Sequence, residues 1–190
     1  MTTWRATQKA HRRADLMASA ARLFAERGFA AVSTADLGDA VGMSGPALYR
    51  HFASKEALLC ALLLDASERL LDGARSLAVG GDPARVFDDL IAFHLDFATT
   101  DADVIRVQDR ELAVLPAAVN QEVRHLQRAY VQEWDRPFAL LRPDLDEPER
   151  QTRLLAAFGL LNSTPHSAAP SGPRAGGILA GMARRALLDA

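Results

Sequence analysis

Apolar residues recur along this chain at intervals of three and four positions, which is the spacing of helices that bury one face. In the first such segment Leu16, Ala20 and Leu23 follow this spacing, and Gly28 lies where a glycine commonly ends a helix. No run alternates apolar and polar residues, and no Asn-Gly or Asp-Gly pair marks a hairpin turn. The pattern therefore predicts an all-α fold.

Capping and helix-breaking residues divide the chain into about nine predicted helices. The first ends at Gly28, and the others cover about 34–41, 44–52, 54–73, 82–99, 101–112, 116–141, 146–163 and 175–188. Small and helix-breaking residues over 165–177 predict a loop before the last helix. The basic stretch 4–13 is predicted to precede the first helix as an arm that follows phosphates or enters a minor groove. An irregular solvated terminus fits its first residues equally well.

The two shortest predicted helices form a pair around Gly42. Ser33 or Thr34 is placed to cap the first of them. Helices this short are unstable alone, so apolar residues such as Leu37 and Leu48 must pack them together. This is the construction of a helix-turn-helix, whose second helix enters the DNA major groove. Short helices joined by glycine also occur in bundles that bind no DNA, so the motif alone leaves both interpretations open.

Polar and small residues of this segment fit DNA binding. Thr34 and Ser44 lie at helix N-termini, where backbone N–H groups favour phosphate. Lys55 lies in the first turn of its helix, where the dipole disfavours a cation, and a bound phosphate would remove that conflict. Ala47 can contact a thymine methyl, and Arg50 can reach guanine or phosphate. The predicted DNA contacts are Arg13, Thr34, Ser44, Gly45, Pro46, Ala47, Tyr49, Arg50, His51 and Lys55. A plain solvated face would carry similar residues.

Charge is distributed unevenly along the chain. The 190 residues carry a net charge of −2, but residues 1–60 hold eight Lys or Arg and five Asp or Glu. A basic N-terminal part joined to an acidic remainder is typical of a polyanion-binding module attached to another unit. We expect a DNA-binding domain over 1–54 and a second helical domain over 55–190.

Residues 9–60 resemble the DNA-binding domain of the TetR family of one-component transcriptional regulators. The matching stretches are 24–29, 34–37, 40–44 and 47–58. In that family the positions of Thr34, Ser44, Gly45, Pro46, Ala47, Tyr49, His51 and Lys55 commonly contact DNA. The resemblance implies a three-helix DNA-binding domain and a C-terminal domain for ligand binding and dimerisation. It also implies a repressor that binds a palindromic operator as a homodimer and is released by a small, largely apolar effector.

Aromatic residues of the second part indicate either a ligand pocket or an ordinary core. The predicted pocket residues are Phe93, His94, Phe97, Val104, Gln108, Tyr130, Trp134 and Phe158. Ligand pockets are mostly apolar with a few polar anchors, which this set matches. Such a stripe is also typical of a packed core, and the pocket interpretation comes from the family. Residues 105–112 faintly resemble regulators that sense acyl-CoA thioesters, which suggests an acyl-CoA-like effector.

The last two predicted helices are rich in apolar and small residues. Two such helices from each subunit would form a two-fold, four-helix interface. The predicted interface residues are Leu154, Phe158, Leu161, Ile178, Met182 and Arg185. The alternative is that these helices only cover the core of a single subunit.

Two other classes of protein remain as alternatives: a helical enzyme and a non-specific DNA-binding protein without an effector. No HExxH, CxxC, GxSxG or glycine-rich phosphate loop is present, and the five histidines are scattered, so we expect no catalytic site, cofactor or metal. A non-specific DNA-binding protein would usually be more basic. The longest apolar run, 57–64, is too short to span a membrane. With Cys60 as the one cysteine, we expect a reducing, cytoplasmic location.

Overall fold

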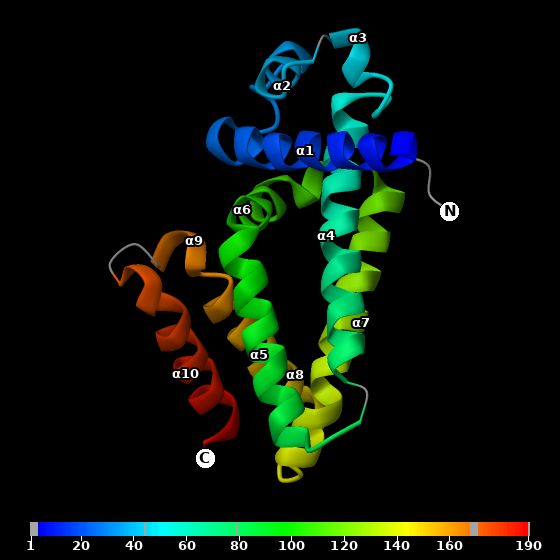
Figure 1. Cartoon of the computed structure of the whole chain (residues 1–190). Coiled ribbons are helices and arrows are strands. Elements are labelled where there is room, and N and C mark those ends of the chain that lie inside the picture. Colours follow the sequence, from blue (N-terminus) through cyan, green and yellow to red (C-terminus); the bar gives the residue numbers. More distant parts are fainter. Residues whose placement is uncertain (1–3, 44, 79, 168–170, 190) are drawn as a thin grey trace.

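The computed structural model describes residues 4–43, 45–78, 80–167 and 171–189, and in these ranges every regular element is a helix (Figure 1). The N-terminal elements are α1 (Trp4–Arg27), α2 (Thr34–Ala40), α3 (Gly45–Leu48) and α4 (Lys55–Leu77). The middle elements are α5 (Pro83–Thr100), α6 (Ala102–Glu111), the 3-10 turn η1 (Leu112–Val114) and α7 (Ala117–Leu141). The last elements are α8 (Glu147–Leu161), α9 (Thr164–Ser167), the 3-10 turn η2 (Gly172–Arg174) and α10 (Ala175–Leu188).

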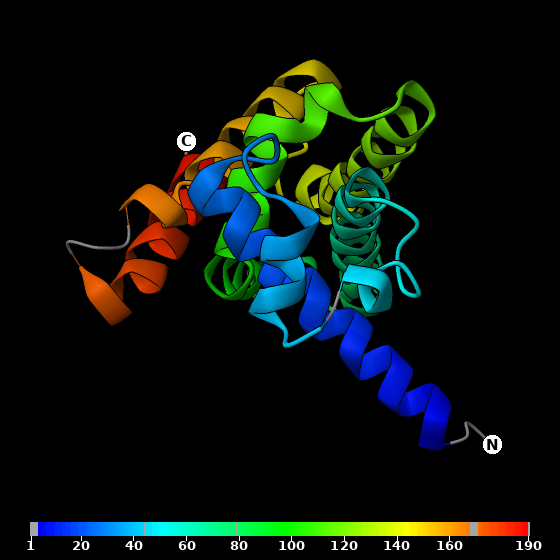
Figure 2. The ribbon, with the colours of Figure 1, turned by 90° about the horizontal axis from the view of Figure 1, so that it is seen from above.

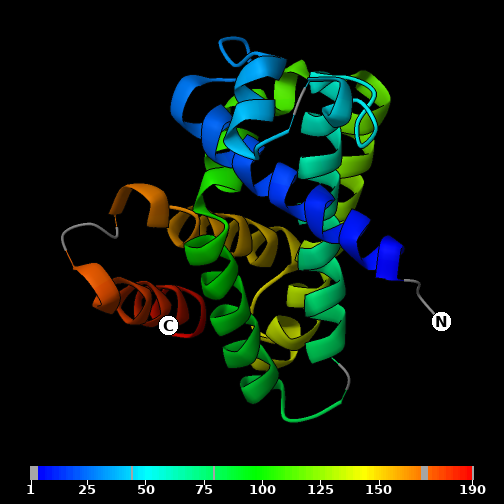
Figure 3. The ribbon, with the colours of Figure 1, turned by 45° about the horizontal axis from the view of Figure 1, so that its top comes forward.

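The helices form a small head on a longer body. In Figure 1, α1 lies across the upper ends of the long helices α4 and α7, and α2 and α3 lie above α1, at the end farthest from the body. Seen from above, the N-terminal turns of α1 extend beyond the rest of the molecule (Figure 2). Figure 3 shows α8 and α10 next to each other on one flank, and these two helices are in contact. The all-α fold predicted from the sequence is confirmed.

Each predicted helix has a counterpart among the described residues, with three differences. The stretch predicted as an arm is helical, because α1 begins at Trp4. The second helix of the pair is helical only over Gly45–Leu48 and continues as turns. The single-turn α9 lies in the region predicted as a loop. Of the two predicted caps, Ser33 rather than Thr34 caps α2, since its side chain accepts from the Asp36 backbone N–H and the Asp36 carboxylate accepts from the Ser33 backbone N–H.

Two hydrophobic clusters make up the core, and α4 contributes to both. The first joins α1 and the helix-turn-helix to the upper half of α4, including Leu58 to Ala66, with Val104 and Val107 of α6. The second joins Leu71 and Ala74 of α4 to buried residues of α5, α7, α8 and α10. The two cores therefore meet within α4, and the division of the chain between residues 54 and 55 stays a prediction.

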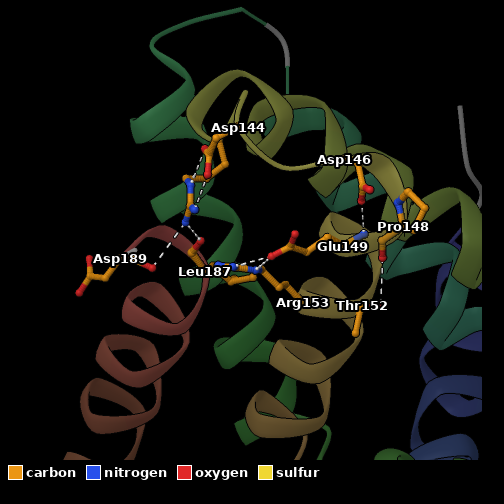
Figure 4. A network of polar contacts seen from close by, with 9 residues as sticks. Asp144, Asp146, Pro148, Glu149, Thr152, Arg153, Leu187 and Asp189 are labelled. Carbon is orange, nitrogen blue, oxygen red and sulfur yellow. Dashed lines mark hydrogen bonds and ion pairs between the residues drawn. The ribbon is translucent and has the colours of Figure 1, made fainter.

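Arg142 ties the corner after α7 to the end of α10. Its Nε and Nη2 bind Asp144 at 2.9 and 2.7 Å, and its Nη1 donates to the backbone oxygens of Leu187 and Asp189 at 3.3 and 3.5 Å. Figure 4 shows Asp144 close to the C-terminal residues Leu187 and Asp189. A guanidinium at the C-terminal end of a helix satisfies its last carbonyls and complements its dipole. This contact holds α10 against the body.

The Asp144 carboxylate makes this corner sensitive to acid. Its hydrogen bonds with Arg142 hold the pKa of Asp144 at about 2, below the ordinary value of 3.8. Because the folded-state pKa is the lower one, the ionised group stabilises the fold above about pH 4, and this contribution disappears as pH falls toward 2. We expect Asp144→Asn to lower Tm at pH 7 and the difference from wild type to vanish near pH 2. Melting curves that stay equally separated across this range would contradict the assignment.

Candidate functional site

The exposed side of the helix-turn-helix presents polar residues around α3. Leu37 and Leu48 are fully buried against α1 and α4, so they orient the two short helices. Gly42 lies between them with φ +63°, the left-handed region in which glycine is favoured. Tyr49 is 52% exposed, and Arg50 is also exposed. The segment thus offers its polar side to solvent at the outer end of the head.

A basic groove lies between the N-terminal turns of α1 and α3. It has a volume of about 410 Å³ and is lined by Gln8, Lys9, Arg12, Met43, Ala47, Arg50 and His51. Within the described part of the chain, the side chains of Lys9, Arg12 and Arg50 form no ion pair or hydrogen bond. Three uncompensated cations around one groove form a site for a polyanion. Lys9 was not among the predicted contacts, although the basic stretch 4–13 pointed to this region.

The His51 imidazole, which lines the basic groove, is in its neutral form. Burial lowers its pKa, and the charges of Lys9, Arg12, Arg13 and Arg50 lower it further. Its Nδ1 is buried and has no hydrogen-bond partner among the residues that the structure describes. The ring therefore adds no positive charge to the groove at neutral pH.

Two predicted DNA contacts bind backbone carbonyls of the head. The Lys55 ammonium donates to the backbone oxygens of Phe29 and Val32 at 2.8 and 2.7 Å. These carbonyls remove the conflict between the Lys55 charge and the α4 dipole, so that conflict does not require a phosphate. The Arg13 Nη1 donates to the His51 carbonyl at 3.2 Å.

The other predicted contacts have different surroundings. Thr34 is the first residue of α2 and is half-buried, while Ser44 lies outside the described residues. Gly45 and Pro46 form the first turn of α3. Ala47 is half-buried and lines the basic groove. The structure thus brings Ala47, Arg50 and His51 together with the start of α1, while the role of each in DNA binding stays a prediction.

The interior of the body holds a chain of buried polar groups. His94 of α5 is 3.0 Å from Tyr130 Oη through Nδ1 and 3.0 Å from Asn162 Oδ1 through Nε2. Because an amide oxygen only accepts, Nε2 carries the proton and Nδ1 accepts from the Tyr130 hydroxyl. Burial lowers the pKa of His94 to about 4 and raises the pKa of Tyr130 well above its usual range. The hydrogen-bonded group of His94, Tyr130 and Asn162 is therefore uncharged at neutral pH.

Aromatic rings surround these polar groups. The ring of Phe158 lies 5.2 Å from that of His94 and 4.9 Å from that of Trp134, measured between centroids. The Nε1 of Trp134 is buried, and no acceptor for it is found in the described ranges. Asn162, at the end of α8, was not predicted, because one amide in an apolar helix gives no periodic signal. The group combines apolar walls with neutral donors and acceptors.

The eight predicted pocket residues do not line one pocket. His94, Tyr130, Trp134 and Phe158 pack together in the core, as the alternative interpretation expected. Phe93 and Phe97 are on another side of α5 and line a surface hollow of about 220 Å³. Val104 lines a separate groove of about 760 Å³ between α1, α4 and the α5–α6 corner. Gln108 is half-buried in α6. Apolar residues occur on two faces of α5, and periodicity does not distinguish the face that meets the core.

The flank formed by α8 and α10 corrects two of the predicted interface residues. Leu154 and Leu161 are fully buried within the subunit, so neither has surface to offer a partner. Phe158 also belongs mainly to the aromatic group of the core. The exposed apolar residues of this flank are Leu155, Ile178 and Met182, at 60, 47 and 43%. Arg185 is exposed and lies next to Gly181 of α10.

The end of α6 holds the end of α1. The Arg110 Nη2 donates to the carbonyls of Phe24 and Ala25 at 2.6 Å each. The backbone N–H of Phe29 donates to Glu111 Oε1 at 3.1 Å. The contact of Glu111 with the head was not predicted from the sequence. These contacts connect the body to the head directly.

The described residues hold neither a metal-binding cluster nor a membrane-spanning helix. No group of three or more His, Cys, Asp or Glu side chains there is arranged to hold a metal ion. Among the described helices, none is both long and apolar enough to cross a membrane.

The protein thus combines a helix-turn-helix head that has a basic groove with a larger all-α body. These features place it in the class of helix-turn-helix proteins. The profile of bacterial regulatory proteins of the tetR family matches residues 16–62. The HTH-type transcriptional repressor Rv1474c of Mycobacterium tuberculosis is 32% identical over 145 residues, which cover 72% of this chain and 78% of that protein. The chain belongs to the tetR family.

Solved structures agree with this assignment. A TetR-family transcriptional regulator from Bordetella parapertussis has a TM-score of 0.84 and 26% identity, covering 93% of this chain and 94% of its own. AibR, solved with isovaleryl coenzyme A and operator DNA, has the same fold, with a TM-score of 0.77, 19% identity and coverage of 93% and 98%. Other curated relatives match over a smaller part of their own sequences. The chain spans 53% of the length of one of them and 26% of the length of two more.

Proposed function

We propose that this protein is a transcriptional repressor that binds a palindromic operator as a homodimer and releases it when a small, largely apolar effector binds the body. The basic groove beside α3 is the observation that carries the proposal. In this assignment residues 1–54 bind DNA, residues 55–190 bind the effector and the second subunit, and α4 connects the two tasks. The protein is not an enzyme in this proposal.

The groove is suited to the sugar-phosphate backbone of a duplex. Lys9 and Arg12 project from α1 toward the same groove that Ala47 and Arg50 line from the segment around α3. Cations beside a short helix can hold phosphates while that helix enters the major groove. The side chain of Ala47 is small enough to approach a thymine methyl closely. Phosphate contacts would set the position, and the few groups on α3 would contribute base preference.

A salt titration of DNA binding tests this function. Operator candidates would be selected from random duplexes, and affinity measured by fluorescence anisotropy for the selected palindrome and for a scrambled duplex. We expect Kd for the palindrome to be at least about a thousandfold lower than for the scrambled duplex, with log affinity falling linearly as log salt rises. Equal affinity for both duplexes would identify a non-specific DNA-binding protein, and no binding at low salt would refute DNA binding.

The flank of α8 and α10 supports the homodimer. Leu155, Ile178 and Met182 expose apolar surface on two neighbouring helices, and Gly177 and Gly181 allow a helix to approach closely. Two copies related by a two-fold axis would cover these residues with the same surface from the partner. A palindromic operator mirrors that symmetry.

The buried group around His94 offers the chemistry to hold an uncharged part of an effector, and its packed rings must separate to admit one. The aromatic rings of Tyr130, Trp134 and Phe158 offer apolar contacts, and Trp134 Nε1 lacks an acceptor in the described structure. A ligand carbonyl that accepts from Trp134 would satisfy that donor. AibR, which has the same fold, is known with isovaleryl coenzyme A. An acyl thioester, with a carbonyl beside an apolar chain, fits this chemistry.

Thermal shift measurements test the effector class. Short-, medium- and long-chain acyl-CoAs would be compared with free coenzyme A and the corresponding free acids. An acyl-CoA that binds only the folded protein should raise Tm by about 5 °C or more at a hundredfold excess over its Kd. It should also weaken operator binding. Absence of a shift for every acyl-CoA would remove this effector class while leaving the DNA-binding proposal intact.

A further inference from the structure

We propose that Arg13 and Lys55 are positioning residues that fix the helix-turn-helix by binding backbone carbonyls of the head, rather than contacts to DNA phosphates. The inference rests on the proposed DNA-binding function, and it assigns two of the cations nearest the motif to a different task. Lys55 binds two backbone carbonyls of the chain and Arg13 binds one, and each cation lies over an aromatic ring.

Lys55 holds the connection that precedes α2. Besides its hydrogen bonds to the carbonyls of Phe29 and Val32, its Nζ lies 4.4 Å from the centroid of the Phe29 ring. Hydrogen bonds from a charged donor are stronger than neutral ones, and a cation over an aromatic face adds to them. Val32 directly precedes Ser33, the cap of α2. Lys55 therefore fixes the point at which α2 begins.

Arg13 holds the connection that follows α3. Its Nη1 donates to the His51 carbonyl, and its guanidinium carbon lies 4.1 Å from the centroid of the Phe52 ring. Phe52 is buried in the head core, so this contact ties the segment after α3 to α1. The arrangement matches that of Lys55 at the opposite end of the motif.

The two cations together hold both ends of the helix-turn-helix. The motif runs from α2 to α3, and α3 has only four residues, too few to hold its own direction. Its orientation must then come from its ends and from the buried Leu37 and Leu48. Moving either end would rotate α3 relative to the basic groove, and base contacts depend on that angle more than phosphate contacts do.

The remaining cations are better placed for phosphate. Two of the three N–H donors of Lys55 are used inside the head, and its side chain is half-buried. Arg13 is exposed, as Arg12 and Lys9 are, but its side chain is engaged by His51 and Phe52. Over the described ranges, the side chains of Arg12 and Lys9 beside the groove have no hydrogen-bonding partner. Arg12 therefore offers a matched control for a true phosphate contact.

The test compares Lys55→Met and Arg13→Met with Arg12→Met in the full-length protein. Affinity for the selected operator and for a scrambled duplex is measured across a salt series, at a temperature where circular dichroism shows every variant folded. Loss of a phosphate contact should weaken both duplexes alike and reduce the salt slope by about 0.9. Loss of positioning should weaken the operator alone, by about ten- to a hundredfold, with the slope unchanged. We expect the second result for Lys55→Met and Arg13→Met, the first for Arg12→Met, and partial rescue in Lys55→Arg.

Equal losses on both duplexes with a reduced slope would make Lys55 and Arg13 phosphate contacts and overturn the proposal. Unchanged operator affinity in the folded variants would overturn it as well. That result would show that Lys55 and Arg13 contribute to stability alone and do not position the helix-turn-helix for DNA binding. Amide hydrogen exchange without DNA gives a separate measurement. Lys55→Met should speed exchange at Phe29, Ser33 and Leu37, while α10 is unaffected. If the wild type shows no operator preference, the proposed function fails, and unchanged exchange at these amides would separately overturn the positioning role.

Discussion

Trp134→Ala is expected to lower the free energy of unfolding by about 3–5 kcal/mol, a large part of the stability of a domain of this size. Trp134 is fully buried in α7, and its ring lies 5.6 Å from that of Phe87 and 4.9 Å from that of Phe158. Truncation removes these contacts and leaves a cavity, because close-packed helices relax only partly around a missing side chain. Urea unfolding followed by circular dichroism measures the change.

Trp134→Phe is the matched control. Phenylalanine keeps most of the apolar volume and removes a buried N–H donor that has no acceptor in the described structure. An unsatisfied buried donor is costly, so its removal offsets part of the lost contact. We expect a cost of no more than about 2 kcal/mol. Similar losses in the two variants would show that the indole N–H, rather than ring volume, stabilises the core. In the proposed effector site, Trp134→Phe should also weaken the response to an acyl-CoA.

Met182→Glu is expected to convert the proposed homodimer to monomers and to lower operator affinity about a hundredfold or more. Met182 is 43% exposed on α10, beside the exposed Ile178 and across from α8. A carboxylate there would be repeated by the two-fold axis and buried without a partner, which strongly disfavours association. The operator affinity falls because one head then binds without its twin. Sedimentation equilibrium and anisotropy measure the two effects.

Val114→Glu provides the comparison for this experiment. Val114 is 59% exposed in η1, outside the flank of α8 and α10, so the charge should leave both assembly and operator affinity unchanged. Dimers that persist in Met182→Glu would place the interface elsewhere. Loss of dimers in both variants would instead indicate a general effect of added negative charge.

The sequence was sufficient for the helices and for the outward side of the head. Periodic apolar residues such as Leu16 and Leu23 and local caps such as Ser33 depend on neighbours within one or two turns, so they can be recognised from the chain alone. The basic groove was anticipated in part, because Arg50 and the stretch 4–13 carry their charge visibly. The same periodicity did not separate Leu154 from Leu155, since α8 is apolar on more than one side and only packing decides which is buried.

Hydrogen bonds between residues far apart in the chain could not be predicted from the sequence. Lys55 meets carbonyls 23 and 26 positions earlier, and His94 meets Asn162 68 positions later. A backbone carbonyl is present at every residue and gives no sequence signal, so an internal role for a cation looks identical to a surface role. The acyl-CoA suggestion from residues 105–112 had the same weakness, because Arg110 and Glu111 bind the end of α1 in the structure.

Because α4 belongs to both cores, a change in its tilt in the body also moves the head. Its 23 residues span about 34 Å at 1.5 Å per residue. The upper half of α4 packs in the head and the lower half packs in the body. A rearrangement around Leu71 that tilts α4 would therefore displace its N-terminal end and the head. A tilt of about 10° over that length displaces the head by about 6 Å. In the proposed homodimer, two copies of α3 that must reach grooves about 34 Å apart would lose their register after a displacement of that size.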